Sequence, residues 1–264
     1  MICTVSREDD PRLQNYRHVG EPAWLIRHGL FVAEGRLVVE RLIEHGGLVV
    51  ESVLSTPAAF RALEARLDPA WLVLVAEPAI VEGVTGFNFH RGCLALVRRP
   101  SPPPPLAAFA TVKRLVVLEG VGNPDNIGGI FRSAAALGAN AVLLDPTCGD
   151  PFYRKAVRTS MGAVLRLPST RVDPWLPGLA ALDDMGFAIV ALSPSGESTV
   201  DEFAASLPRD VRLALLAGAE GSGLTSGAVA AADVTLRIPV DPRSDSLNVV
   251  VAVSIALQRL APRE

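Results

Sequence analysis

The sequence predicts a two-domain α/β protein whose larger domain is built on a mainly parallel β-sheet. After residue 111, apolar stretches of strand length alternate with helical patterns, which is typical of parallel strands joined by crossover helices. The apolar stretches are nearly continuous, as in strands covered on both faces. A proline run within residues 100–111 cannot continue a sheet or a helix. We therefore expect a semi-rigid linker there between domain 1–99 and domain 112–264, with a proline-rich recognition ligand as the alternative interpretation of the run.

The composition is that of a folded protein with a substantial core. Hydrophobic residues make up 49% of the 264 residues. No apolar run approaches the roughly 18 to 20 residues that span a bilayer, and the opening MICTVSREDDPR lacks the apolar core of a signal peptide. We therefore expect a cytoplasmic protein. Its three scattered cysteines fit neither a disulfide framework nor a zinc site, so no metal is predicted.

In the first domain, the residues before about Gly20 are polar, and we expect them to form a loose lead-in. Strand-like and helical stretches then alternate, as in a compact α/β unit. We expect strands at 31–35, 48–54, 71–76 and 93–97, and helices at 37–46, 57–67 and near 80–84.

In the second domain, the alternation continues to the end of the chain. We expect strands at 114–119, 141–144, 187–192, 213–217 and 234–240, and helices near 128–137, 152–158, 175–185, 224–232 and 247–260. Ligands of parallel sheets bind beyond the carboxyl ends of the strands. The loops that follow these strands are therefore the place to look for a site.

Three strand-to-helix bends carry the unusual sequence of this domain. The first, LEGVGNPDNIGGIFRSAAAL, leads from a strand through glycines and Pro124 into a helical pattern. The second is LALLAGAEGSGL and the third is IPVDPRSDSLNVVVAVSIAL. No phosphate-binding GxxxxGK[ST] occurs, and GAEGSG misses the GxGxxG spacing, so a dinucleotide-binding interpretation is weak.

The three bends resemble, in the same order, the three motifs of the SpoU (TrmH-like) RNA 2′-O-methyltransferases of the SPOUT superfamily. The resemblance covers about residues 115–260. It implies a trefoil-knotted parallel-sheet methyltransferase domain, an exception to the rule that chains do not thread loops. It also implies S-adenosylmethionine as cofactor and a homodimer. The first domain resembles, more weakly, the small α/β ribosomal-protein-like RNA-binding domain that often precedes this fold.

The resemblance also implies which residues hold the cofactor. Main-chain groups of the second and third motifs point to Gly218, Ile238 and Leu247, and Leu192 would help to line the adenine pocket. Independently, backbone groups of glycine-rich loops can approach a nucleobase closely. The alternative is that these loops are only tight turns.

For catalysis, the resemblance points to Asn126, Arg132, Glu220, Ser246 and Asn248. Arg132 is commonly assigned as a base in this family, but a guanidinium stays protonated in proteins, so we favour phosphate binding and alkoxide stabilisation. A surface ion pair is its structural alternative. The structural alternative is capping of a helix for Asn126, Glu220 and Ser246. Asn248 is expected just inside its helix, where a polar side chain needs a partner.

We therefore expect an S-adenosylmethionine-dependent RNA ribose 2′-O-methyltransferase acting on ribosomal RNA. Transfer RNA is the alternative substrate, and a catalytically silent RNA-binding protein or another nucleotide-dependent α/β enzyme are the alternative classes. Val250 departs from the family, which often has Ser or Thr there. Because the net charge is −3, RNA contact must come from a local patch. The candidates, each of which could equally be an ordinary solvated charge, are Arg36, Arg41, Arg91 and Arg98.

Overall fold

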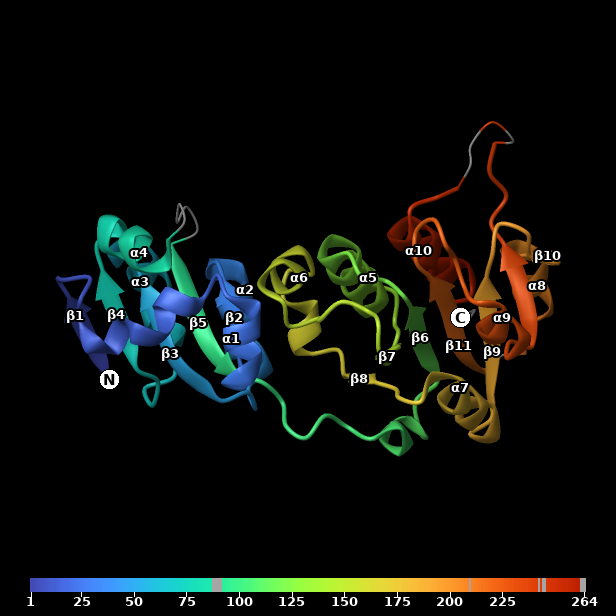
Figure 1. The fold of residues 1–264 in the computed structure, drawn as a ribbon, viewed down its shortest axis with the longest axis horizontal. Helices are drawn as coiled ribbons and strands as arrows, with labels where there is room; N and C mark the ends of the chain where they lie inside the picture. Colours follow the sequence, from blue (N-terminus) through green and yellow to red (C-terminus); the bar gives the residue numbers. More distant parts are fainter. Residues whose placement is uncertain (87–91, 209, 242, 244–245, 262–264) are drawn as a thin grey trace. The chain divides into compact units, whose positions relative to one another are not determined.

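A computed structural model describes residues 1–86, 92–208, 210–241, 243 and 246–261. The chain divides into two compact units, of which the first comprises residues 1–101 and 152–166 and the second comprises residues 102–151 and 167–264 (Figure 1). Each unit has its own sheet. Among the described residues, no helix has both the length and the apolarity to cross a membrane.

The first unit is a five-stranded mixed sheet with the order β1-β4-β3-β5-β2. β1, β4 and β3 run parallel to one another, whereas β5 is antiparallel to both of its neighbours. The predicted alternation of strands and helices is confirmed from β2 onward. The elements are β2 (Leu30–Glu34), α2 (Arg36–His45), β3 (Val50–Ser55), α3 (Pro57–Leu63), β4 (Val73–Ala76), α4 (Pro78–Thr85) and β5 (Cys93–Arg98).

The expectation of a loose lead-in before Gly20 is wrong. β1 (Ile2–Val5) adds an edge strand to β4, and a 3-10 helix, η1 (Pro11–His18), follows it. Leu13 and Tyr16 on η1 are completely buried. The Tyr16 hydroxyl lies 2.7 Å from the Ser52 Oγ of β3, which gives that buried polar group a partner. A short helix, α1 (Pro22–Arg27), then leads into β2.

Residues 152–166 belong to the first unit although they come late in the chain. They contain α6 (Arg154–Thr159) and a short 3-10 turn, η4 (Ala163–Leu165). The rings of Phe152 and Phe31 have centroids 4.9 Å apart, and an Arg154 Nη1 lies 3.4 Å from Oε2 of the buried Glu34 on β2. An apolar contact and an ion pair thus join this segment to β2.

The second unit is a seven-stranded sheet with the order β10-β12-β9-β11-β6-β7-β8, in which every neighbouring pair is parallel. The prediction of a parallel sheet is confirmed. The strands are β6 (Arg114–Glu119), β7 (Ala141–Leu144), β8 (Ser169–Arg171), β9 (Phe187–Leu192), β10 (Ser198–Thr199), β11 (Arg212–Gly218) and β12 (Val234–Arg237). β8 and β10 were not expected, because they are too short to show an apolar pattern.

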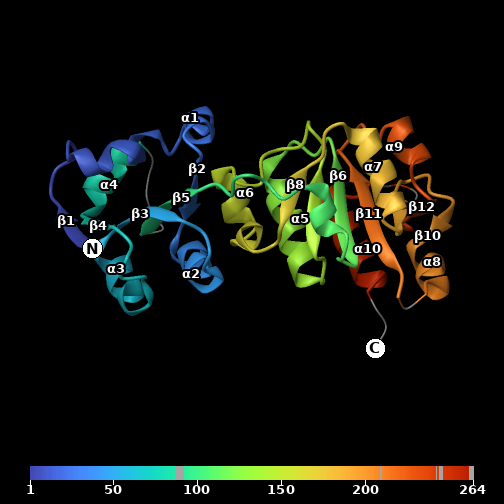
Figure 2. The ribbon, with the colours of Figure 1, turned by 90° about the horizontal axis from the view of Figure 1, so that it is seen from below.

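Helices cover this sheet (Figure 2). α7 (Trp175–Asp184) and α9 (Ser226–Ala230) contribute Leu179, Leu182 and Ala228 to one apolar core with alternate residues of the central strands. The other α-helices among the described residues of this unit are α5 (Pro124–Ala136), α8 (Val200–Ser206) and α10 (Val249–Arg259), of which α8 was not expected.

α5 and α10 pack closely against each other. A Cβ added to Gly129 of α5 would lie 2.9 Å from both methyl carbons of Val250 on α10, so the absence of a side chain is what allows this approach. The Ser254 hydroxyl also donates a 2.7 Å hydrogen bond to Ser133 Oγ. At the carboxyl ends of the same two helices, the buried Arg114 guanidinium donates to the carbonyls of Leu137 and Leu257. Those ends are negative, so a cation there is favourable.

Candidate functional site

The site begins where the carboxyl ends of the central strands meet. Gly218, the last residue of β11, pairs with Glu119, the last residue of β6. On the other side of β11, Leu192 at the end of β9 pairs with Leu236 of β12. All four strands run in one direction, so the loops that follow them leave from the same edge of the sheet.

The three predicted bends come together at the side-chain amide of Asn248. Its Nδ2 donates a 3.1 Å hydrogen bond to Asn126 Oδ1 from the first bend. The same Nδ2 donates to Glu220 Oε1 from the second bend. Its Oδ1 accepts from the backbone of Val250 at 2.8 Å, which holds the amide at the start of α10. One residue from each bend is therefore joined in a single network.

The capping alternatives for Asn126, Ser246 and Glu220 are wrong. α5 begins earlier than expected, at Pro124, and its N-cap is Asn123, whose Oδ1 accepts from the Asp125 amide at 2.9 Å. The N-cap of α10 is Asn248, and that of α9 is Thr225. Asn248 was expected inside the helix, and it stands at the boundary instead.

Arg132 and Ser246 are exposed and, among the described residues, form no hydrogen bond with this network. Within the described ranges, no hydrogen bond or ion pair holds the Arg132 guanidinium. The surface ion pair that was its structural alternative is absent there. Its charge is therefore available to an anionic ligand. No hydrogen bond among the described residues joins Ser246 to Asn126, Glu220 or Asn248.

The residues predicted to hold the cofactor are all partly exposed. Leu192 ends β9, Ile238 follows β12, Gly218 ends β11, and Leu247 precedes the network residue Asn248. Leu192 and Ile238 lie at the ends of the neighbouring strands β9 and β12, and partly exposed aliphatic side chains suit the flat apolar faces of an adenine ring. The described residues fit an adenine nucleoside in this respect.

Gly218 is sterically required by the second bend. A Cβ there would collide with the backbone of Gly223 and Leu224, because the Gly223 amide donates a 3.0 Å hydrogen bond back to the Ala219 carbonyl. Gly221 and Gly223 have φ angles of 87° and 66°, a region that favours glycine. The loop is thus a closed turn with its main chain accessible to a ligand.

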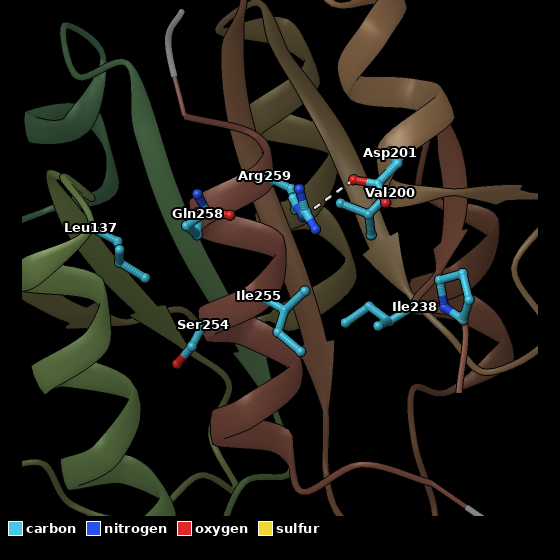
Figure 3. A pocket seen from close by; sticks show the side chains of 9 residues that line it. Leu137, Val200, Asp201, Ile238, Ser254, Ile255, Gln258 and Arg259 are labelled. Carbon is cyan, nitrogen blue, oxygen red and sulfur yellow. Dashed lines mark ion pairs between the residues drawn. The ribbon is translucent and has the colours of Figure 1, made fainter. Parts of the chain in front are cut away.

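A pocket of about 610 Å³ is lined by residues of α8 and α10, by Leu137 at the end of α5, and by Ile238 and Pro239 after β12. Of the predicted cofactor residues, Ile238 alone is among those that line it in the described part of the chain. Figure 3 shows Ile238 and Ile255 pointing toward each other across it, beside the 3.3 Å ion pair of Arg259 with Asp201. This pocket does not include the Asn248 network. In the same described ranges, no group of three or more His, Cys, Asp or Glu side chains could hold a metal ion.

The buried carboxylate of Glu119 was not predicted from the sequence. Its Oε1 accepts from Trp175 Nε1 at 2.8 Å and from the Thr225 hydroxyl at 2.9 Å, and its Oε2 accepts from the Thr225 amide at 2.7 Å. Glu119 therefore fixes α7 and the start of α9 to the end of β6. The one available signal was a charged residue that directly follows the apolar run of a predicted central strand.

Asp145, also missed, organises the loop after β7. Burial raises its pKa, but hydrogen bonds from Thr147 and Cys148 outweigh burial, so the pKa lies below the ordinary value. Arg171 on β8 donates to the carbonyls of Asp145, Pro146 and Cys148 at 2.8 to 2.9 Å. The same loop supports the first bend, because the Gly149 amide donates to the Val121 carbonyl at 2.9 Å.

The arginines predicted to contact RNA in the first unit are paired with glutamates. Arg36 lies 3.7 Å from Glu40, Arg41 lies 2.9 Å from Glu44, and Arg98 lies 2.5 Å from Glu51. Arg91 falls outside the described residues. Pairing reduces the charge that these three groups offer to a phosphate.

Comparison with known proteins gives consistent matches. The sequence model of the SpoU rRNA Methylase family matches residues 113–258. An uncharacterized tRNA/rRNA methyltransferase of Mycobacterium bovis is 36% identical and covers 97% of this chain and 90% of its own. The SpoU methyltransferase AviRb of Streptomyces viridochromogenes, solved in complex with the cofactor AdoMet, is 25% identical over 95% of this chain and 97% of its own, with a TM-score of 0.80. A structure concerned with the 2-OH methylation of C/U34 on tRNA is 29% identical over 56% of this chain and 94% of its own, with a TM-score of 0.50.

Proposed function

The chain belongs to the SpoU rRNA Methylase family, and we propose that it transfers a methyl group from S-adenosylmethionine to a ribose 2′-hydroxyl of ribosomal RNA. The RNA methyltransferase class follows from the family and from the M. bovis relative. The ribose hydroxyl is supported by the likeness to the structure concerned with 2-OH methylation on tRNA. Ribosomal RNA is favoured over transfer RNA because the first domain resembles a ribosomal-protein-like RNA binder.

The observation that carries this proposal is the Asn248 amide, which joins Asn126 and Glu220 across residues that are far apart in the sequence. Positioning is the main requirement of methyl transfer, since oriented reactants lower a barrier by several kcal/mol. A polar network that joins the three bends is what such positioning needs.

S-adenosylmethionine is the methyl donor, and it supplies an electrophilic methyl group on a sulfonium. Leu192, Ile238 and Leu247 would contact its adenine, and the closed turn that begins at Gly218 would present main-chain groups to it. The AviRb structure with bound AdoMet supports S-adenosylmethionine as the cofactor.

Arg132 would act on the substrate side of the site. Its guanidinium is exposed and carries no ion pair with any described residue, so it can bind a phosphate and stabilise the developing alkoxide. The hydroxyl proton then leaves to solvent. Proton abstraction by Arg132 is the alternative, and the pH-rate profile of Arg132→Lys separates the two. Retained activity with an unchanged acidic limb supports charge stabilisation, whereas a shifted limb supports abstraction.

The remaining family features belong to the same proposal. They are a trefoil knot in the methyltransferase domain, a homodimer, and RNA binding by the first domain. The division into domains 1–99 and 112–264 with a linker between them is also part of it, except that residues 152–166 belong to the first unit.

The test is methyl transfer with radiolabelled S-adenosylmethionine to total ribosomal RNA and, separately, to total transfer RNA. Ribose methylation protects the following phosphodiester from alkali, so label should appear in alkali-resistant dinucleotides of ribosomal RNA. Arg132→Ala and Asn126→Ala should reduce incorporation at least about a hundredfold. Label in transfer RNA alone favours the alternative substrate. Binding of S-adenosylmethionine without transfer to any RNA favours a silent protein, and preference for NAD or ATP contradicts the proposal.

A further inference from the structure

Three aromatic rings form a partly exposed stack in the first unit. The His18 and Trp24 ring centroids are 4.4 Å apart with 12° between the ring planes. Trp24 and His28 follow at 3.8 Å and 18°. His28 is exposed and His18 keeps 31% of its side-chain surface. The stack therefore presents a flat ring to solvent at the His28 end.

Core packing and polar contacts hold the stack in place. Trp24 packs against the core cluster of the first unit. His28 Nδ1 lies 2.8 Å from the Trp24 carbonyl, so it donates there in the favourable tautomer, and His18 Nδ1 lies 3.0 Å from Glu21 Oε1. Because these bonds fix the ring orientations in advance, a ligand that stacks on His28 need not order them.

An available cation is next to His28 in the sequence. Arg27 ends α1 directly before His28 and is exposed, and no hydrogen bond or ion pair engages it among the residues that the structure describes. The neighbouring Arg17 donates to the Glu8 carbonyl, a neutral group, at 2.6 Å. By contrast, the arginines on and near α2 are engaged by Glu40 and Glu44.

We propose that this surface binds an unpaired RNA nucleotide, with its base stacked on His28 and its phosphate paired with Arg27. Aromatic faces combined with a nearby cation are the recurrent means of holding single-stranded nucleic acid, since every base has a flat face and a linked phosphate. The inference rests on the proposed function and specifies where the first unit touches its substrate. The proposed contact takes the place of the predicted RNA contacts of Arg36, Arg41 and Arg98, because these three arginines are paired with glutamates.

The test measures binding of a fluorescein-labelled single-stranded RNA dodecamer to the full-length protein by fluorescence anisotropy. His28→Ala should weaken binding at least about fivefold, the lower end of what one stacked base contributes. The matched control is His45→Ala, which removes an exposed histidine at the end of α2 and should leave the affinity unchanged. Arg27→Ala should weaken binding and reduce its salt dependence, whereas Arg61→Ala, at a second exposed arginine without a described partner, should not.

His28→Phe keeps a flat ring without the imidazole nitrogens, so it should retain most of the affinity. Equal affinities of His28→Ala and His45→Ala, with RNA binding intact, would overturn this inference alone. Loss of affinity in His28→Phe equal to that in His28→Ala would overturn the stacking mode. Absence of RNA binding by the unaltered protein would overturn both this inference and the proposed function. Thermal unfolding and S-adenosylmethionine binding, measured on every variant, should not change.

Discussion

At the scale of single residues, Asn248 has two separate tasks. Its Oδ1 caps α10 through the Val250 amide, while its Nδ2 donates to Asn126 and Glu220. A cap is interchangeable among short polar residues, because any of them offers an oxygen at the right distance. A bridge between two fixed acceptors needs the length and the donor of asparagine.

The two tasks can be separated by substitution. Asn248→Ser keeps a capping oxygen but is too short to bridge, so we expect unfolding free energy within about 0.5 kcal/mol of the unaltered protein and a loss of methyl transfer of about 10- to 100-fold. Asn248→Ala should show the same loss of transfer together with about 1 kcal/mol of destabilisation. Denaturant unfolding and kcat/KM measure the two effects. Full activity in Asn248→Ser would contradict the bridging task.

The residue that caps each helix could not be predicted from the sequence alone. Asn126, Asn123 and Asn248 are all short polar residues near a helix start, so composition alone does not decide which one caps. Pro124 was the stronger signal, since proline is favoured in the first turn of a helix and Asn123 precedes it. The buried Glu119 needed knowledge of Thr225 and Trp175, which reach it only in the folded chain.

At the scale of elements, the central strands were predictable and the short edge elements were not. β6, β7 and β9 match their expected bounds because each contains a continuous apolar run that is largely buried. β12 ends earlier than expected, at Arg237, whose guanidinium instead donates to the carbonyls of Gly196 and Glu197. β1 is an edge strand that buries only Val5 fully, so it shows no regular alternation. Its existence depends on pairing with β4, a contact that local sequence does not encode.

The close contact between α5 and α10 predicts that Gly129→Ala changes the free energy of unfolding in opposite directions, depending on the side chain at residue 250. In the unaltered protein, Gly129→Ala places a methyl 2.9 Å from both Val250 methyl carbons. That overlap costs about 1 to 3 kcal/mol against a helix-propensity gain of about 1 kcal/mol, so we expect net destabilisation. In the Val250→Ala background the overlap is gone, and Gly129→Ala should stabilise. Urea unfolding of the four proteins measures this coupling. Stabilisation by Gly129→Ala in both backgrounds would refute the close packing.

The loop after β7 makes stability depend on acid pH. Asp145 has a folded-state pKa below the unfolded value of about 3.9 because hydrogen bonds from Thr147 and Cys148 outweigh its burial. The contribution of Asp145 to the free energy of unfolding is therefore present above about pH 4. It is lost as the pH falls through the folded-state pKa. Asp145→Asn should be less stable than the unaltered protein at neutral pH and should lose less stability between pH 5 and pH 2. Chemical denaturation at several pH values measures this. If the stability of the two proteins changed with pH in parallel, Asp145 would be excluded as the source of the acid dependence.

At the scale of the whole molecule, the chain passes between the two units three times. The boundaries follow Ser101, Pro151 and Arg166. A protease site introduced at the exposed Ser101 should therefore yield two fragments that remain associated, because Phe152 and Arg154 of the second fragment contact Phe31 and Glu34 of the first. Size-exclusion chromatography after cleavage measures this. Separation of the fragments would show that residues 152–166 contribute little to the first unit.

The position of β11 has a consequence for synthesis of the protein on the ribosome. β11 is translated after β9, yet it lies between β9 and β6 in the finished sheet. Until residues 212–218 emerge, both of these strands carry an unsatisfied edge, which is a template for pairing with another chain. Such late, non-local pairing is also intrinsically slow. The nascent chain is therefore most vulnerable to aggregation between completion of Leu192 and release of Gly218, and this is the interval in which a chaperone would have the greatest effect on its yield.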